Sequence, residues 1–411
     1  MCTCITPALD PPPAAIADDV ETIRAQINHA LTTERQGDTE RSFQIADQAR
    51  AAAARLSYRP LHAEALVQVA RALDGRQTAD ARTAAEALYF EALGIAEAVH
   101  HDQLAAVIWR RLVLLAIRME AGTGQARERL SHLEEAVSQI GNCACGQAKL
   151  HHLRGEIHDR DGDHATAAAE KQRAIDAITS ASGDHAELGS YYHALAKSLE
   201  QQGQLGQALG LYARAQQIAG QPGEIGASLP DRVELHMNHA LALKRSGNLA
   251  GARAELEAAQ AQLPAACRGA SLNAGVLETF LSDVAYQAGD AAEALMHGRR
   301  ARDIYRQIGA PDHRLAEAHT NIANAELKRR NFQDAVDAYQ DALELRLQHL
   351  GEHHYQVGVN HGSLAEALVA LARRDEATLH LEKAERILAS VSPENREIQD
   401  WIQSIRGQLV S

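Results

Sequence analysis

The sequence has few aromatic residues and little proline. Aromatic residues make up 4% of the 411 positions, with four Phe and two Trp, although 45% of the chain is hydrophobic. A core that is poor in Phe and Trp must be filled mainly by Ala and Leu. Helix faces that consist of small Ala side chains allow helices to stack closely. Four of the 10 prolines precede residue 14. Extended β-structure is therefore not expected, and the apolar content is too high for a disordered chain.

Positive charge and long apolar runs are also lacking. Lys and Arg number 41 against 54 Asp and Glu, which gives a net charge of −13. Nucleic-acid binding depends on clustered Lys and Arg, so no nucleic-acid partner is expected. No stretch approaches the ~18–20 apolar residues of a membrane span, which argues against membrane insertion. The first residues, MCTCITPALDPPP, lack the basic start and apolar run of a secretion signal. These absences predict a soluble, cytoplasmic protein.

Cysteine is too sparse for a disulfide framework, since the chain has five. The best candidate metal ligands are Cys143 and Cys145, followed by His151 and His152. However, Cys-x-Cys lacks the middle residue of the usual zinc knuckle, and no second ligand pair follows at a normal distance. We therefore expect two free thiols in a loop between repeats, with a metal or redox role as the alternative. No metal or cofactor is predicted.

A repeat of about 42 residues runs through most of the chain. Its template is a small residue, Ala five positions later, a bulky residue four after that, and Ala three further on. Gly203, Ala208, Tyr212 and Ala215 fit it fully, whereas Lys171 occupies the bulky position of the preceding unit. The last Ala of successive units recurs at intervals of 38 to 44 residues, at Ala49, Ala92, Ala136, Ala174, Ala215, Ala259, Ala301, Ala342 and Ala384. The spacing predicts about nine units.

Each unit is expected to contain two helices, A and B. Gly203 would end helix A in a positive-φ conformation, and Ala208, Tyr212 and Ala215 would share one face of helix B. We therefore predict an all-α solenoid with a flexible N-terminal tail at residues 1–17 and an array of about nine helix pairs at 18–391. Residues 392–411 would form a C-terminal capping helix, since apolar residues recur there at helical spacing.

The repeat resembles the tetratricopeptide repeat (TPR), in the form of about 42 residues seen in kinesin light chains. Residues 309–324 (GAPDHRLAEAHTNIAN) look like that family's inter-repeat turn and helix start, and residues 351–357 (GEHHYQV) begin the next repeat similarly. The resemblance implies a TPR-type α-solenoid, a right-handed superhelix of antiparallel helix pairs. It also implies a protein or peptide ligand.

A narrower resemblance concerns residues 56–66 (LSYRPLHAEAL) and 101–106 (HDQLAA). They look like the repeat region attached to serine/threonine kinases of myxobacterial type. The chain has no glycine-rich phosphate loop, no His-Arg-Asp loop and no Asp-Phe-Gly, so no enzymatic activity is predicted. The leading hypothesis is a non-catalytic scaffold, a regulatory or adaptor module in bacterial signalling. The alternatives are the C-terminal interaction region of a kinase whose catalytic domain is not in this chain, or a peptide-sensing regulator.

The A helices should line the inner groove, where their polar residues meet a ligand. Amide side chains offer a donor and an acceptor, which match the backbone of an extended peptide. The predicted groove residues are Asn238, Asn321, Asn324, Lys328, Arg329, Asn360 and Ser363. The kinesin-light-chain resemblance implies peptide contact for Asn238 and Asn321 only, and Lys328 with Arg329 would favour an acidic ligand. In the alternative interpretation these Asn residues bond neighbouring helices.

Histidines fill one position of helix A in several units, four residues before its small residue. His151, His236, His319 and His361 stand there. The tetratricopeptide family prefers a large side chain at this position. These four residues are therefore predicted to pack between helices and to bind no metal.

Overall fold

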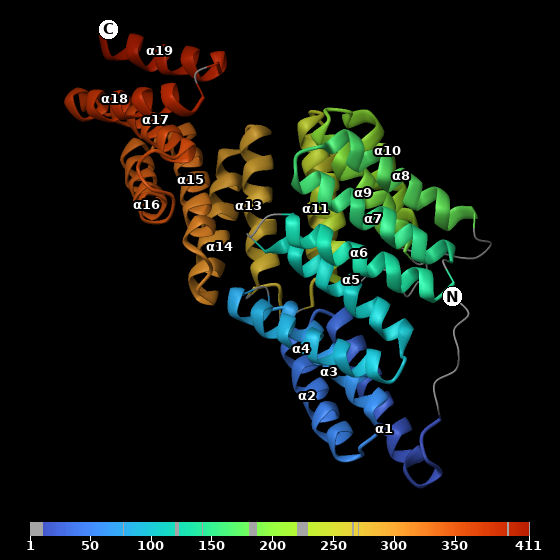
Figure 1. Ribbon diagram of the computed structural model, residues 1–411. Coiled ribbons are helices and arrows are strands. Elements are labelled where there is room, and N and C mark those ends of the chain that lie inside the picture. The colour runs from blue at the N-terminus through green and yellow to red at the C-terminus, as the bar shows by residue number, and fades with distance from the viewer. Residues whose placement is uncertain are drawn as a thin grey trace. The chain divides into compact units, whose positions relative to one another are not determined.

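The computed structural model describes residues 11–410, except for 77, 120–122, 142, 181–186, 220–228, 265–266, 270 and 393. The first ten residues of the predicted tail lie outside this description. The described residues form helices and no strand (Figure 1). The predicted all-α fold is confirmed. The chain divides into two compact units, Met1–Ala242 and Leu243–Ser411, and each is described by itself.

The helices follow one another in pairs. In the first unit they are η1 (Ala14–Ile16), α1 (Ala17–Arg35), α2 (Thr39–Arg55), α3 (Arg59–Asp74), α4 (Ala79–Ala98), α5 (Asp102–Arg118), α6 (Gly124–Gln139), α7 (Ala144–Arg160), α8 (His164–Ser180), α9 (Leu188–Gln201) and α10 (Leu205–Ala219). Helix α11 (Leu229–Arg245) contains the boundary between the units. The second unit continues with α12 (Leu249–Gln262), α13 (Leu272–Gln287), α14 (Ala291–Ile308), α15 (Asp312–Lys328), α16 (Phe332–Leu350), α17 (Tyr355–Ala370), α18 (Arg374–Val391) and α19 (Arg396–Val410).

The odd-numbered helices, the A helices, form the inner side of each unit. Successive A helices contact one another directly, as in α1–α3, α3–α5, α5–α7 and α13–α15. Among the described residues, successive B helices make no contact of comparable extent. A stack whose A helices approach one another more closely than its B helices curves toward the A side. We call the surface that the A helices present there the inner face.

The turn between helices A and B needs a left-handed backbone residue, as the sequence predicted. Gly203 provides it between α9 and α10 with a φ of 77°. In two later units, Arg330 and Ala372 adopt the same conformation with φ of 66° and 59°. The turn geometry is therefore kept even where the side chain is unfavourable for it.

The Ala-rich face of helix B packs as the template predicted. Ala208, Tyr212 and Ala215 are fully buried in a cluster with residues of α9 and α11. Lys171, in the equivalent of the Tyr212 position, is 1% exposed. One unit therefore buries a charged side chain where most of the others bury a ring or an aliphatic group.

Helix α19 covers the last pair. Ile402 and Ile405 are buried against α17 and α18, and the Trp401 ring lies directly over Gly362. A Cβ added at Gly362 would come within 2.4 Å of the Trp401 ring. Glycine at this position therefore permits the close approach of the terminal helix.

We expect Gly362→Ala to displace α19. The clash with Trp401 should lower the free energy of unfolding by ~1–3 kcal/mol and speed hydrogen exchange in α19. The matched control is Gly210→Ala in α10, where no atom lies within 4 Å of the added Cβ. Because Ala favours helix, this control should gain ~0.5–1 kcal/mol. Equal exchange in α19 of Gly362→Ala and the wild type would show that the packing of Trp401 does not depend on this glycine.

Candidate functional site

Polar side chains join neighbouring A helices along the inner face of each unit. In the first unit, Arg24 of α1 pairs with Glu64 of α3 at 2.8 Å. Arg118 of α5 pairs with Asp74 of α3 at 2.7 Å. These partners lie about one repeat apart in the sequence, so each contact ties one helix pair to the next.

In the second unit, two predicted groove residues of α15 bond to the backbone of α13. The Asn321 Nδ2 donates to the Thr279 carbonyl oxygen at 3.0 Å. The Lys328 Nζ donates to the Tyr286 carbonyl oxygen at 3.0 Å and lies 4.7 Å from the centre of the Tyr286 ring. Both side chains remain partly or fully exposed. They connect repeats and still reach the surface of the inner face.

Three further predicted residues lie close by. The Tyr339 hydroxyl donates to Asn324 Oδ1 at 2.5 Å. The same hydroxyl interacts with Ser363 of α17. Arg329 pairs with Glu326 at 3.0 Å. The structure thus places Asn324 and Ser363 on one tyrosine, whereas the charge of Arg329 is compensated within its own helix.

Asn360 does not belong to this surface. It is 1% exposed, its Nδ2 donates to the Tyr339 carbonyl oxygen at 2.9 Å, and its Oδ1 accepts from Arg346. The amide therefore holds α17 against α16 and cannot reach a ligand. This corrects the predicted place of Asn360 in the groove. Its position in the helix explains the error, because Asn360 lies three residues after buried Val357 and four before buried Leu364.

Asn238 lies in the first unit, on α11. Its Nδ2 donates to His193 Nε2 at 2.9 Å and to Glu234 Oε1 at 3.4 Å. The contacts of Asn238, Asn321 and Asn360 are those of the alternative interpretation, in which the amides bond neighbouring helices. Peptide binding by Asn238 and Asn321 stays a prediction.

The buried Lys171 lies at the centre of a charged cluster. In the sequence, Lys171 is visible only as an exception to the repeat template. Its Nζ lies 2.6 Å from Glu156 Oε1 and 2.5 Å from Asp159 Oδ2. Ser198 of α9 also donates to Asp159 Oδ2, at 2.7 Å. Burial alone would raise the pKa of Glu156, but the Lys171 charge outweighs it and lowers that pKa to about 2. The cluster therefore joins α7 and α8 through full charges and α9 through the Ser198 hydroxyl.

Gly155 makes room for the Lys171 stem. A Cβ at Gly155 would lie 2.7 Å from Lys171 Cγ and 3.0 Å from the Ala167 carbonyl oxygen. Gly155, the small residue of this helix A, is therefore needed for the Lys171 side chain of the following helix B to fit.

Next to this cluster, polar groups of three A helices approach one carboxylate. Arg110 of α5 lies 3.9 Å from Glu187, and Lys149 of α7 lies 3.6 Å from the same oxygen. Tyr191 of α9 donates to the other oxygen of Glu187 at 3.2 Å. Burial lowers the pKa of Arg110 although a third of its side chain is exposed.

Cys143 and Cys145 are both disulfide-bonded, so the prediction of two free thiols is wrong. Cys143 is the N-cap residue of α7, and Cys145 is buried in the first turn of that helix. A disulfide-bonded sulfur has no thiolate to offer a metal. Among the described residues, no group of three or more His, Cys, Asp or Glu side chains is arranged to hold a metal ion.

The histidines of the A helices pair with neighbouring B helices. His151 lies 2.7 Å from Glu170, and the Nδ1 atoms of His361 and His380 lie 2.8 Å apart. His319 and His361 are 4% and 5% exposed. These contacts fit the predicted packing role.

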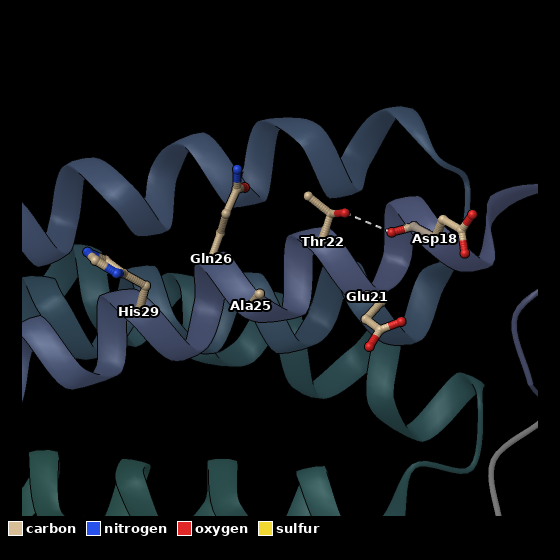
Figure 2. Close-up of a pocket in the computed structure, with 6 residues that line it drawn as sticks. All are labelled: Asp18, Glu21, Thr22, Ala25, Gln26 and His29. Atoms are coloured by element: carbon tan, nitrogen blue, oxygen red, sulfur yellow. Dashed lines mark hydrogen bonds between the residues drawn. The ribbon is translucent and has the colours of Figure 1, made fainter.

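A shallow hollow along α1 is lined by Asp18, Glu21, Thr22, Ala25, Gln26 and His29 (Figure 2). All six come from one helix, and all are exposed. The only bond drawn among them runs from the Thr22 hydroxyl to the Asp18 carbonyl oxygen in the same helix (Figure 2). The hollow brings no groups from different elements together, so it offers no site. Within the described part of the chain, no helix is both long and apolar enough to span a bilayer.

Comparison with known proteins connects the second unit to a family. Residues 273–348 and 314–390 match the family model described as tetratricopeptide repeat. The matched stretches include Asn321, Asn324, Lys328, Arg329 and Ser363. No match was found among curated proteins.

Solved structures resemble this chain to different extents. The nearly identical TPR-like repeats of kinesin-light-chain type from Podosopora anserina are 21% identical and cover 51% of this chain and 99% of theirs, with a TM-score of 0.43. The APC/C hetero-tetramer Cut9–Hcn1 is 12% identical and covers 95% of this chain and 91% of its own, with a TM-score of 0.46. A signal-transduction ATPase with numerous domains (STAND) from Pyrococcus horikoshii, which has a tetratricopeptide repeat sensor, reaches a TM-score of 0.65 at 11% identity. It covers 94% of this chain, which spans 55% of its length. That similarity concerns the fold alone, an all-α repeat solenoid.

Proposed function

Because residues 273–390 are tetratricopeptide repeats, we propose that the chain is a non-catalytic scaffold that binds an extended segment of a partner protein on its inner face. Arrays of this fold are typical of protein–protein interaction. We assign the scaffold to the cytoplasm, as a regulatory or adaptor module in bacterial signalling. The absence of kinase and hydrolase motifs from the sequence supports a role without catalysis.

The observation that carries the proposal is the state of Asn321. One hydrogen bond from Nδ2 to Thr279 fixes the amide, and Oδ1 has no partner among the described residues. An oriented acceptor on an exposed face matches the N–H group of an extended peptide. Lys328 adds a positive charge two helical turns further on, where no carboxylate of the described residues pairs with it. This arrangement favours an acidic segment.

We expect Asn321→Ala to weaken partner binding by roughly 5- to 150-fold, since losing one hydrogen-bonding group costs ~1–3 kcal/mol. A partner is first isolated by affinity capture on the full chain and then titrated against wild type and variant. Lys328→Ala should instead slow association, with an effect that shrinks at high salt.

Asn331→Ala is the matched control for Asn321→Ala. Asn331 lies at the turn before α16 and donates to Glu326 at 2.7 Å, so this variant also loses one amide bond in the same unit. Its partner affinity should be unchanged. A folded Asn321→Ala variant that binds as tightly as the wild type would remove the proposed site from this face.

A second candidate function is a peptide-sensing regulator. The STAND protein, whose repeats are described as a sensor, supports it as a precedent with the same fold. In that case, as in the kinase-associated alternative, the response would come from a domain outside this array. Sequencing the reading frame around the gene for a kinase or ATPase domain tests both alternatives.

A further inference from the structure

Histidine occupies the same interhelical contact in three helix pairs. In each of them, a residue of helix A meets the residue 19 positions later, on helix B of the same pair, at 2.6 to 2.8 Å. The contacts are His151–Glu170 between α7 and α8, Glu278–His297 between α13 and α14, and His361–His380 between α17 and α18. In the first two the imidazole faces a carboxylate, whereas in the last it faces a second imidazole.

The two kinds of contact respond to protons in opposite ways. A protonated histidine forms an ion pair with a carboxylate, so acid keeps the contact between His151 and Glu170 attractive. The Nδ1 atoms of His361 and His380 lie 2.8 Å apart, so one of them donates and the other accepts. Once both rings are protonated, both Nδ1 atoms are donors and both rings carry a positive charge. This contact can then no longer form.

The surroundings of the two rings disfavour a positive charge on either of them. Burial, followed by the charges of His380 and Lys383, lowers the pKa of His361 to about 4. Burial and the Lys383 charge also lower the pKa of His380, and Glu376 opposes that shift. Glu376 is itself paired with Arg373 at 2.6 Å. Both rings are therefore neutral at pH 7.

The helices packed against α17 and α18 bring no further carboxylate that is free to compensate such a charge among the described residues. Helix α16 contributes Arg346, which donates to Asn360 of α17. Helix α19 contributes Arg406, which pairs with Glu385 of α18. Glu366 of α17 accepts a hydrogen bond from the α19 indole at 3.3 Å. Each of these groups already has a partner of its own.

Both histidines are chain neighbours of residues on which α19 packs. His361 precedes Gly362, over which the Trp401 ring lies. His380 precedes Leu381, which is buried in one cluster with Ile402 and Ile405 of α19. The contact between the rings therefore joins the two helices that together support α19, and separation of the rings removes part of that support.

We propose that the His361–His380 contact is a proton-operated latch, which holds α17 and α18 together at neutral pH and releases α19 when both rings are protonated. Release uncovers Trp401 and the apolar residues beneath it, while the rest of the second unit stays folded. The imidazole–carboxylate contact between α13 and α14 of the same unit stays closed under these conditions. The latch is independent of the partner site proposed at Asn321.

The test is acrylamide quenching of Trp401 fluorescence in the full chain, titrated from pH 7 to pH 4. The parent carries Trp109→Phe, so that Trp401 is its single tryptophan. We expect quenching to rise several-fold, with a midpoint between 4, the pKa of His361, and 6.5, the value for free histidine. The helical circular dichroism should fall by no more than the 15 residues of α19 account for.

Two variants at one position identify the titrating contact. His380→Glu creates an imidazole–carboxylate contact like those of the other two pairs, so quenching should keep its pH 7 value throughout the titration. His380→Gln retains a hydrogen-bonding group but removes one like charge, and should shift the midpoint to lower pH by ~1 unit. The matched control is His349→Gln, which removes an exposed imidazole from α16 and should titrate like the parent.

Three results would overturn the latch. The first is a rise in quenching that persists unchanged in both His380 variants. The second is a parent in which Trp401 stays protected down to pH 4. The third is a loss of circular dichroism from the whole chain at the same midpoint, because Trp401 would then be exposed by global unfolding.

Discussion

Lys171→Met should lower the free energy of unfolding by about 3 kcal/mol, at the lower end of the range for breaking a buried ion pair. Methionine keeps most of the stem beside Gly155 but leaves Glu156 and Asp159 without their cation. We expect the smaller loss of stability within that range because the two carboxylates are 30% and 21% exposed and can be partly hydrated by water. Urea denaturation, together with hydrogen exchange in α7 to α9, measures the loss and locates it.

The control for this prediction removes the two carboxylates as well. In the triple variant Lys171→Met, Glu156→Gln and Asp159→Asn, no buried charge lacks a partner, so most of the lost stability should return. If the triple variant is as unstable as Lys171→Met alone, the cluster contributes through packing and not through charge.

Moderate acid should destabilise both units because several histidines are buried in the neutral form. Burial lowers the pKa values of His152, His193 and His361 to about 4, against 6.5 for a free side chain. The folded state then binds fewer protons than the unfolded state between pH 6.5 and 4. Stability is therefore complete above pH 6.5 and is lost as the pH falls toward 4. At pH 5 each histidine should cost about 2 kcal/mol.

Thermal melts at pH 7 and pH 5 test this, with His361→Phe as the diagnostic variant. Phenylalanine keeps a ring in the same position but cannot titrate beside His380 and Lys383. The difference in stability between the two pH values should shrink by about 2 kcal/mol in the variant. An unchanged difference would mean that His361 is not the group that titrates.

The repeat could be predicted from the sequence because its physical signal is local. Ala208 and Ala215 lie seven residues apart on one helical face, and only close helix packing explains small residues at these positions in nearly every unit, Arg129 being the exception. The left-handed turn residue follows from Gly203 for the same reason. Arg330 and Ala372 show the limit, because the fold imposes that conformation on residues that do not favour it.

The candidate sites depend on which side chains of different helices meet. The prediction that Asn360 lines the groove is wrong, although its spacing from Val357 and Leu364 indicates a buried position. Lys171 is an exception to the template in the sequence, but its partners lie 12 and 15 residues before it, on another helix. The repeat template does not distinguish Tyr89 from Tyr212, since both residues fit its bulky position. Only the packed structure shows that one hydroxyl has a partner and the other has none.

The central claim is that the inner face of the helix pairs binds the partner, and site-specific photo-crosslinking tests it most directly. A photoreactive residue is placed at Val107 on α5, which is 44% exposed, and separately at Lys328 on α15. The outer controls are Met296 on α14 and Leu379 on α18, which are 41% and 52% exposed. We predict that partner adducts form from positions 107 and 328 and stay at background from 296 and 379. Adducts that form from the outer positions and not from the inner ones would contradict the account.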